Sequence, residues 1–384
     1  MHGFFRGCLP CLFAAGGGGG QDMKEVVTSA HGTGGKSSFD LVQKIFKRHL
    51  AGPLLSPDDA ASFPTPLSVG GEAATGVESL LVTTDTHVVD PIIFPGGDIG
   101  KLAITGVVND LLTRGGRPQF LSLGFVLEEG LPLSSLSQIV ASLAKEMNRH
   151  EIQLLCADTK VVTAREGKAG LMIASTLFGE PINPNNPNSQ VGGCSTSAVA
   201  MSGPQVGDHL ILTGPLGSHG LAVLQARETL PFQSTISSDC ASLFPLLAPL
   251  LYENAKINYM RDPTRGGLAG ILHELALQFK ISFELDESSL PAQPAVRAGL
   301  ELLGLDLLEV ANEGVMLLFV PEAESAAVVE RLRMHPLGQA AVVVGKVRPS
   351  RPASAVQAPL VMVTALGGRR VVPWPEALNL PRIC

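Results

Sequence analysis

The chain has 384 residues, a formal net charge of −7 at pH 7 and 45% hydrophobic residues. This length exceeds what a single hydrophobic core usually serves, so we expect two domains, and the apolar content excludes a chain that is disordered over most of its length. The acidic balance provides no broad positive field for a phosphate backbone, which argues against nucleic acid as a partner.

Residues 1–30 are predicted to form a disordered extension. Their apolar part is short, interrupted by proline and without a clear cleavage site, so a trimmed targeting segment is the alternative interpretation. Cys8 and Cys11 form a C-x-x-C pair, but no second Cys or His pair follows nearby to complete a zinc site. The six cysteines lack the spacing of a disulfide framework and no apolar run is long enough to span a membrane, so we expect a cytoplasmic protein.

A glycine-rich stretch, AHGTGGKSSFDLVQKIF (30–46), precedes a predicted helix. Backbone N–H groups of Gly32, Gly34 and Gly35 are placed to wrap a phosphate at the positive end of that helix. The stretch nearly matches a P-loop, but Ala30 replaces the first glycine and no firm strand precedes it. A true P-loop, a looser phosphate-binding flap and a plain flexible turn are three open interpretations.

Residues 31–180 are predicted to form the first α/β domain, because the hydrophobic period switches repeatedly between that of strands and that of helices. A helix at 98–116 has Asp98 at its expected N-cap and ends at a Gly-Gly pair. The other predicted elements are strands at 79–85, 119–127, 152–158 and 170–179, and a helix at 134–150.

A linker rich in Pro, Asn, Gly and Ser is predicted at 181–207, and a second α/β domain at 208–348. Residues 349–384 are expected to add a closing strand at 361–372 and a mobile tail. The elements expected in the second domain are strands at 209–214, 281–285, 315–320 and 340–347, and helices at 219–228, 240–253, 264–279, 295–304 and 324–334.

Three aspartates are candidates for binding a metal ion. Asp85 and Asp158 each end a predicted strand, at the sheet edge where α/β folds usually hold ligands. Asp110 falls within the apolar stripe of its own helix, where an uncompensated charge is costly. Mg²⁺ would compensate it, because this ion is commonly held by one or two carboxylates together with substrate phosphates. The alternative is that Asp110 is a hydrogen-bonded capping group and the other two aspartates begin turns.

Two further motifs carry charged residues in chemically useful places. RDPTRGGLAG (261–270) sets Arg265 beside glycines that open a helix, which suits either an anion site or a simple turn. Glu313 stands directly before a predicted buried strand, whose neighbours would raise its pKa as a general base requires. A solvated loop acid is the alternative for Glu313.

The chain ends in a proline-rich segment whose last residue is Cys384. Pro373, Pro375 and Pro381 prevent a helix there, so we expect an extended tail that rises roughly 3.3 Å per residue. Such a tail carries the thiol on the order of 35 to 40 Å from the last predicted strand. The thiol is therefore expected to reach a distant pocket.

A set of motifs distributed along residues 31–384 together resembles a known family. The motifs are HGTGG, TTDTHVVDPIIFPGGDIGKLAITGVVNDL, GFVLEEGLP, ADTKVV, RDPTRGGL, LLGLDLLEVANEG, HPLG and the terminal PRIC. By these motifs the chain is similar to the HypE family of hydrogenase maturation proteins, the carbamoyl dehydratases of the aminoimidazole ribonucleotide synthetase (PurM-like) superfamily. Ala157, Ser218 and Val315 depart from the family pattern, where glycine, aspartate and lysine are expected.

The resemblance implies two PurM-like α/β domains, a homodimer formed through the N-terminal sheets, and binding of ATP and Mg²⁺. It also implies that a carbamoyltransferase of the HypF type loads the Cys384 thiol with a carbamoyl group, which ATP-dependent dehydration converts to a thiocyanate. The cyanide then passes to the iron of a nickel-iron hydrogenase on a scaffold of the HypC and HypD types.

Residue roles follow from the same resemblance. Glu313 is expected to take the amide proton, Lys160 to offset phosphate charge, and Cys384 to carry the substrate. A superfamily relative that phosphorylates a free small molecule would need no Cys384 and is the main alternative; a non-enzymatic ATP-sensing scaffold is another. Mg²⁺ is expected on Asp85, Asp110 and Asp158, and the nucleotide on Gly32, Gly34, Gly35, Asp85, Asn109, Asp110 and Asp158.

Overall fold

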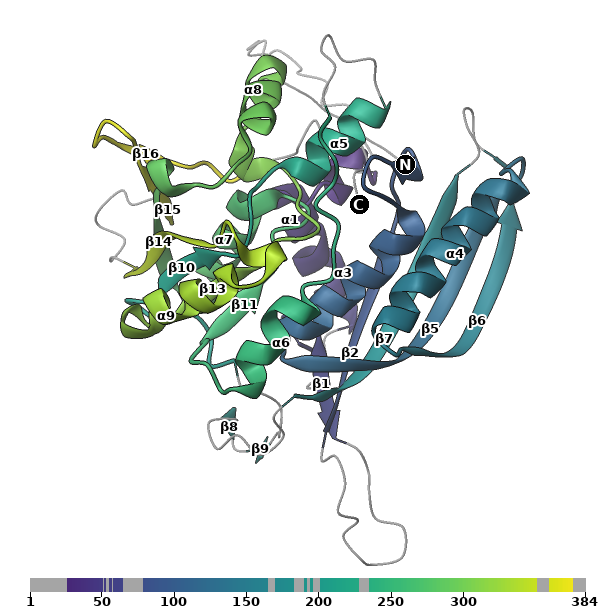
Figure 1. The fold of residues 1–384 in the computed structure, drawn as a ribbon, viewed down its shortest axis with the longest axis horizontal. Helices are drawn as coiled ribbons and strands as arrows, with labels where there is room; N and C mark the ends of the chain where they lie inside the picture. The colour runs from purple at the N-terminus through teal and green to yellow at the C-terminus, as the bar shows by residue number, and fades with distance from the viewer. Residues whose placement is uncertain are drawn as a thin grey trace, which may run out of the picture.

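Two β-sheets, one from each half of the chain, pack with their helices into adjoining α/β layers (Figure 1). Most of the predicted extension at 1–30, much of the predicted linker at 181–207, and the tail from 376 onward with Cys384 lie outside the described residues. The computed structural model describes residues 26–50, 52, 55–56, 58–64, 79–164, 170–182, 190–191, 194–195, 201–227, 235–350 and 359–375.

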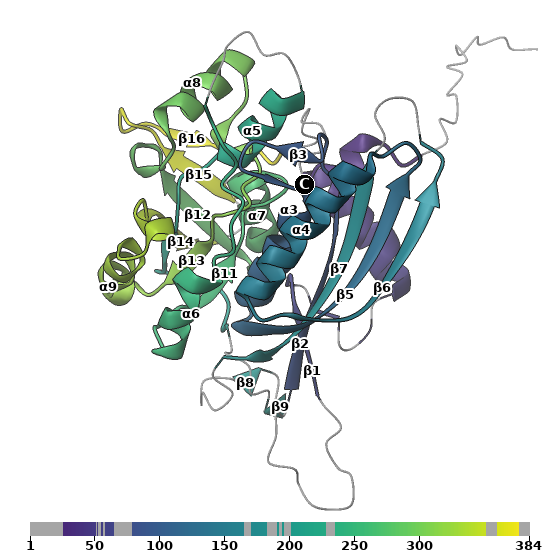
Figure 2. The ribbon, with the colours of Figure 1, turned by 45° about the vertical axis from the view of Figure 1, so that its right-hand side comes forward.

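The first sheet has five strands, and two helices cover one of its faces (Figure 2). Strands β5 and β6 run parallel and the other neighbours are antiparallel. Strand β6 forms an edge, and all its residues are exposed. In sheet order the strands are β1 (Ala61–Pro64), β2 (Ser79–His87), β7 (Leu171–Pro181), β5 (Gly116–Glu128) and β6 (Gln153–Val162), and the helices are α3 (Ile99–Thr113) and α4 (Leu133–Arg149).

Helix α3 begins as the sequence predicts. The Asp98 carboxylate accepts hydrogen bonds from the N–H groups of Gly100 and Lys101, both at 2.9 Å, and so satisfies two donors of the first turn. The helix is buried almost all round, because it packs against α4, the first sheet and elements of the second half. This central position brings Asp110, near its C-terminal end, to the junction between the layers.

The second sheet has seven strands and forms the larger core. In sheet order they are β11 (Tyr259–Arg261), β13 (Leu317–Val320), β10 (His209–Leu212), β14 (Val342–Pro349), β12 (Ile281–Asp286), β15 (Leu360–Val363) and β16 (Arg369–Val371). The accompanying helices are α5 (Ser218–Arg227), α6 (Phe244–Tyr252), α7 (Gly267–Phe279), α8 (Pro294–Leu303) and α9 (Glu322–Arg333). Short elements are β3 (Ile93–Phe94), β4 (Gly97–Asp98), β8 (Gln190–Val191), β9 (Cys194–Ser195), η3 (Glu287–Ser289), η4 (Leu307–Glu309) and η5 (Pro336–Gly338).

Two strand predictions need correction. The single closing strand expected at 361–372 is wrong, since β15 and β16 form a hairpin around Gly367, whose φ of 79° suits a tight turn. Asp158 does not end its strand, because β6 continues to Val162. Strand β11 was not predicted, and its three residues are too few to show a period.

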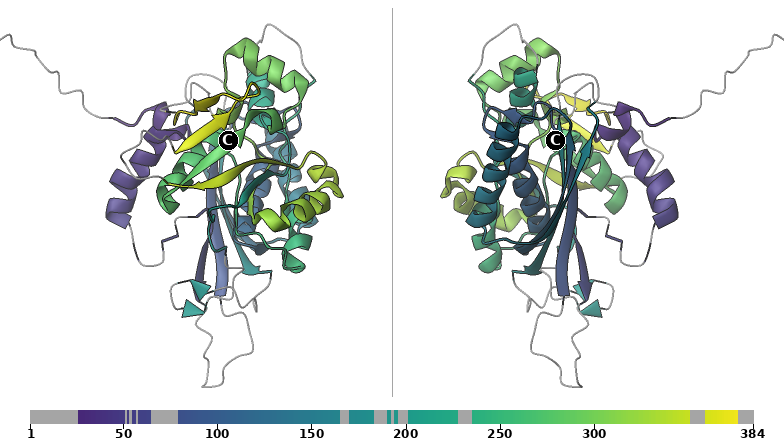
Figure 3. Two further views of the ribbon diagram at one scale, coloured as in Figure 1. Left: turned by 90° about the vertical axis from the view of Figure 1, so that its left-hand side faces the viewer. Right: turned by 90° about the vertical axis from the view of Figure 1, so that its right-hand side faces the viewer.

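The N-terminal helical segment, purple in Figure 3, lies beside the yellow C-terminal strands of the second sheet. It comprises η1 (Ser29–Gly32), α1 (Lys36–Leu41), a π-helical stretch η2 (Val42–Phe46) and α2 (Lys47–Leu50). The backbone N–H of Lys36 donates to the carbonyl of Pro375 at 2.9 Å. Among the residues that the structure describes, no helix is both long and apolar enough to cross a membrane.

Candidate functional site

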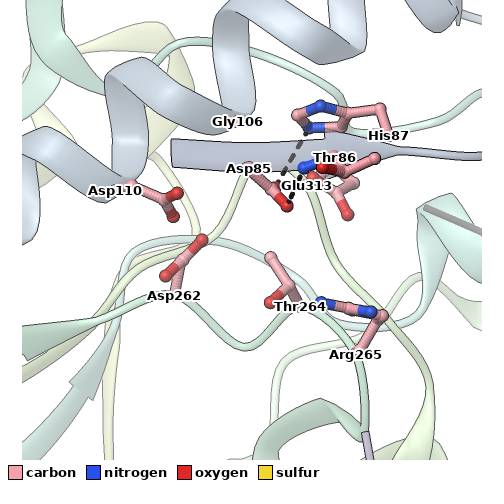
Figure 4. Close-up of a pocket in the computed structure, with 9 residues that line it drawn as sticks. All are labelled: Asp85, Thr86, His87, Gly106, Asp110, Asp262, Thr264, Arg265 and Glu313. Carbon is pink, nitrogen blue, oxygen red and sulfur yellow. Dashed lines mark hydrogen bonds and ion pairs between the residues drawn. The ribbon is translucent and has the colours of Figure 1, made fainter. Parts of the chain in front are cut away.

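A pocket lies where the two layers meet (Figure 4). Its carboxylates come from β2, α3 and two loops of the second half, and Figure 4 shows Asp85, Asp110 and Asp262 facing a shared space. The cavity of about 40 Å³ has room for an ion with a few waters, so a nucleotide would have to extend beyond it. The lining residues are Asp85, Thr86, His87, Gly106, Asp110, Asp262, Thr264, Arg265 and Glu313.

Strand β2 places Asp85 and His87 on the same side of the sheet, two residues apart. His87 Nε2 lies 3.3 Å from Asp85 Oδ2. Burial lowers the pKa of His87, and the nearby Asp85 carboxylate only partly opposes this shift. A Cβ on Gly106 of α3 would come within 2.6 Å of His87 Nε2, so a glycine is required where the helix passes the ring.

Asp110 faces the pocket from α3, as its position in the apolar stripe predicts. Burial raises its pKa well above the usual range, and the carboxylates of Asp262 and Asp85 raise it further. Thr83 Oγ1 donates a hydrogen bond to Asp110 Oδ2 at 3.2 Å. Within the described ranges of the chain, the carboxylate accepts no bond from its own helix and has no cationic side chain bonded to it.

Glu313 is buried, with 4% of its surface exposed, so it is not a solvated loop acid. Burial raises its pKa well above the usual range, and Asp262 and Asp239 add to the shift. Its backbone is held in place: the N–H of Glu313 donates to Asp239 Oδ1 at 3.2 Å, and its carbonyl accepts from Ala241 N at 3.3 Å. A buried acid with high proton affinity can act as a proton acceptor for a bound substrate.

Asp262 is the pocket carboxylate that the sequence reasoning missed. It directly follows β11, is 5% exposed, and has its pKa raised to about 7, first by burial and then by Asp59. The sequence feature that could have identified it is the RDPTRGG motif, in which Asp262 directly follows the end of the unpredicted strand β11. Thr264 and Arg265 of the same motif line the pocket beside it, so this motif builds one wall.

Two ion pairs join the elements that build the pocket. Asp58 Oδ2 is 3.0 Å from Arg114 Nη1, and Asp59 Oδ2 is 2.6 Å from Arg261 Nε. Tyr259 donates its hydroxyl to Asp58 at 2.6 Å. These largely buried contacts connect the end of α3 to β11, the elements that carry or precede Asp110 and Asp262.

Asn109 was expected to bind nucleotide, but the structure gives it internal partners. It is 2% exposed and does not line the pocket. Its side-chain amide donates to Ala241 O at 3.1 Å, and its Oδ1 accepts from Leu243 N at 2.8 Å. These bonds tie α3 to the segment before α6, so Asn109 serves as a connection between the two halves of the molecule.

The glycine-rich stretch lies against the pocket wall. Gly34 has a φ of 80°, and a Cβ there would come within 2.5 Å of the Arg265 carbonyl carbon. The N–H of Gly34 donates to Ser38 Oγ at 2.9 Å, and that of Lys36 donates to Pro375 O. These N–H groups already have protein partners, which does not favour a P-loop. Neither Gly32 nor Gly35 lines the pocket.

Asp158 and Lys160 lie away from the pocket in this chain. Both are exposed on edge strand β6, where Lys160 Nζ is 2.7 Å from Asp158 Oδ2. The Lys160 interaction lowers the pKa of Asp158. Strand β6 is three strand intervals from β2, or roughly 14 Å, so Asp158 cannot share one ion with Asp85 within a flat sheet. The expected trio of Asp85, Asp110 and Asp158 is not assembled within one chain.

The pocket carboxylates suit a partly hydrated divalent cation. No three Asp, Glu, His or Cys side chains in the described part of the chain converge closely enough to hold an ion alone. Nevertheless, Asp110 and Asp262 each have a raised pKa because burial and the neighbouring carboxylates disfavour their charge. Mg²⁺ fits this arrangement, since it retains waters and takes part of its coordination from substrate phosphates.

Comparison with known proteins identifies the family. Two family models match: AIR synthase related protein, N-terminal domain, over residues 57–180, and its C-terminal domain over 205–356. Carbamoyl dehydratase HypE of Azotobacter vinelandii is 37% identical over 361 residues, covering 93% of this chain and 97% of the relative. The chain belongs to the HypE family. HypE of Rhodobacter capsulatus is 40% identical over 361 residues, covering 94% and 98% of the two chains.

Solved HypE structures share the fold. A HypE structure in complex with ATP is 37% identical with a TM-score of 0.70, covering 94% of this chain and all of the other. A HypE–HypF complex matches at 31% identity with a TM-score of 0.73, covering 87% and 99%. These findings confirm the resemblance and the two PurM-like α/β domains. A likeness to Aquifex aeolicus thiamine monophosphate kinase, at 16% identity and TM-score 0.56 over 86% and 97% of the chains, concerns the fold alone.

The three departures from the HypE pattern lie in different surroundings. Ala157 is exposed on β6 opposite Leu123. Ser218 and Val315 are both buried, at 2% and 1% exposed. A buried aspartate and lysine at those two places would need partners, whereas serine and valine carry no charge.

Proposed function

We propose that this chain uses ATP and Mg²⁺ to dehydrate a carbamoyl group carried on Cys384, giving a thiocyanate. The supporting observation is a pocket, lined by both halves of a HypE-family chain, in which carboxylates lie close enough to raise one another's pKa. Its relatives are named carbamoyl dehydratases, and one HypE structure is described in complex with ATP. The product would supply the cyanide ligand of a nickel-iron hydrogenase.

The chemistry requires activation of a poor leaving group. The carbamoyl oxygen forms a bond to the γ-phosphorus of ATP, and ADP leaves. Two N–H protons are then lost as the C–O bond breaks, so that phosphate departs and a C≡N triple bond remains on sulfur. ATP would supply the phosphoryl group, and a bound Mg²⁺ would offset the negative charge of the phosphates.

The residues of the pocket divide this work. Asp85, Asp110 and Asp262 would hold the cation, since their carboxylates face one space (Figure 4). Arg265 lines the same pocket and would offset charge on the transferred phosphoryl group. Glu313 would take an N–H proton, because its environment favours the protonated form.

A homodimer would complete the site. Strand β6 presents ten exposed residues at a free sheet edge, including Leu154, Leu155 and Val161 at 48%, 61% and 68% exposed. Such an edge favours pairing with another chain. We propose that a second copy covers it, and that Asp158 and Lys160 approach a nucleotide only in that assembly. The proposed further partners are a HypF-type carbamoyltransferase and a scaffold of the HypC and HypD types.

Intact-mass measurement tests the function. The full chain is loaded with a carbamoyl group by a HypF-type enzyme, treated with ATP and Mg²⁺, and digested. We expect the loss of one water from the C-terminal peptide, and neither loading nor loss in Cys384→Ala. Carbamoyl-dependent ATP turnover that persists in Cys384→Ala would instead support a kinase acting on a free small molecule.

A further inference from the structure

The last described residues of the chain occupy a defined binding position. Trp374 stacks on His273 of α7, with ring centroids 5.4 Å apart and an interplanar angle of 7°. Phe39 of α1 also packs against Trp374, with ring centroids 5.3 Å apart and an interplanar angle of 57°. The Lys36 N–H bonds to Pro375 O at 2.9 Å. We call Lys36, Phe39 and His273 the tail socket.

The socket fixes both the ring and the backbone of this segment. His273 Nε2 lies 3.1 Å from Val372 O, so a protonated Nε2 donates to the carbonyl two residues before Trp374. Burial lowers the pKa of His273, so the ring is neutral near pH 7. Aromatic pairs of this kind stabilise a contact beyond the burial of its surface. Two such pairs and two hydrogen bonds hold the segment in place.

The tail socket is connected to the pocket through a few residues. Gly34, two positions before Lys36, packs directly on the backbone of Arg265, and Arg265 lines the pocket. The same short glycine-rich stretch therefore contacts the pocket wall at one end and the C-terminal segment at the other. Its glycines permit this close approach, which a side chain at position 34 would block.

We infer that Trp374 is a positioning residue, which roots the C-terminal segment beside the pocket so that Cys384 starts from a fixed point. This role rests on the proposed function. Nine residues, 376–384, follow the anchor, so Cys384 can lie at most roughly 30 Å from it. The segment that carries Cys384 is therefore shorter than the one expected from the sequence, which began at the last predicted strand.

The length change alone has a small effect. Release of Trp374 would move the root back to Val372 and lengthen the tether from nine to twelve residues. The effective concentration of the thiol would then fall by about 1.5-fold, because it varies as the −3/2 power of length. A larger loss in the variant would show that the socket also sets the direction in which the tether leaves.

The anchor can be observed without the reaction, since Trp374 is the only tryptophan in the chain. Acrylamide should quench its fluorescence several-fold less in the folded full-length protein than in urea. Phe39→Ala should increase quenching, whereas Phe46→Ala, at a position 51% exposed on the following helical stretch, should not. Equal quenching in the folded and urea-unfolded chain would overturn the anchor.

The positioning role is tested by single-turnover dehydration of the carbamoyl-loaded full-length chain. Trp374→Ala should slow dehydration at least three-fold with the KM for ATP within two-fold, and Trp374→Phe should recover most of the rate. Tyr252→Ala, an aromatic truncation at an exposed site on α6, is the control.

A three-residue Gly-Ser insertion after Pro375 measures the effect of tether length alone. If Trp374→Ala is no slower than that insertion, positioning is refuted; if wild type forms no thiocyanate, the proposed function fails while the quenching result stands.

Discussion

The pocket carboxylates should destabilise the fold when no cation is bound, and Asp262 allows this cost to be measured. Burial, followed by repulsion from Asp59, raises its pKa from 3.8 to about 7. The folded chain therefore keeps a proton between roughly pH 4 and pH 7 that the unfolded chain has released. Stability should fall as the pH rises through this window. A shift of about three units corresponds to about 4 kcal/mol above pH 7.

Asp262→Asn removes the charge and preserves the size of the side chain. Without nucleotide or Mg²⁺, we expect the variant to unfold with a free energy about 2–4 kcal/mol higher than wild type at pH 8, and nearly the same at pH 4. Urea unfolding at both pH values measures the difference. Added Mg²⁺ and ATP should stabilise wild type at pH 8 more than the variant, because binding relieves the repulsion only where the charge exists.

Asp58→Asn is the matched control, since it makes the same chemical change to a neighbouring buried aspartate. Asp58 already has partners in Arg114 and Tyr259. Its loss leaves a buried guanidinium without its carboxylate and should lower the free energy of unfolding by about 3 kcal/mol. A decrease in both variants at pH 8 would refute the reasoning, because it would mean that Asp262 is also compensated within the chain.

Three further predictions concern the pocket and its supports. The KM for ATP should rise as the pH falls below about 7, because a proton on Asp262, whose pKa is about 7, competes with the cation; a flat profile from pH 6 to 8 would contradict this. Asn109→Ala should lower the free energy of unfolding by about 2 kcal/mol and leave the KM for ATP within two-fold, whereas a large rise in KM would restore its predicted nucleotide role. Gly34→Ala should cost at least about 1 kcal/mol in urea unfolding, because φ is 80° and Arg265 occupies the space; Gly32→Ala, whose Cβ meets nothing within 4 Å, should be nearly neutral.

Hydrophobic period was sufficient to predict most elements and one essential feature of the site. The position of Asp110 inside an apolar stripe indicated a carboxylate without a charge partner on its helix, and in the structure it lines the pocket with its pKa raised by burial. Glu313 could be recognised in the same way, from its place before a fully buried strand. In both cases the signal is local, because burial of a helix face or strand is encoded within a few residues.

Strand order and tertiary neighbours are not encoded in this local way, and the differences between expectation and structure follow from that. Asp85 and Asp158 both stand late in predicted strands, but β7 and β5 separate those strands in the sheet. Asn109 lies one residue from Asp110 in the sequence, yet the helical turn directs it to a different neighbour. Asp262 was missed because β11 joins its sheet through tertiary contacts with β13 alone.

The ion pairs of Asp58 and Asp59 explain how the mutually repelling carboxylates are held together. Asp110 is on α3 and Asp262 follows β11, and their charges disfavour one another. The consecutive residues Asp58 and Asp59 bind Arg114 at the end of α3 and Arg261 at the end of β11, respectively. One short segment thus attaches both elements, and its two ion pairs oppose the separation that repulsion would cause. The pocket can therefore keep an excess of negative charge ready for a cation, because none of these four paired residues belongs to its lining.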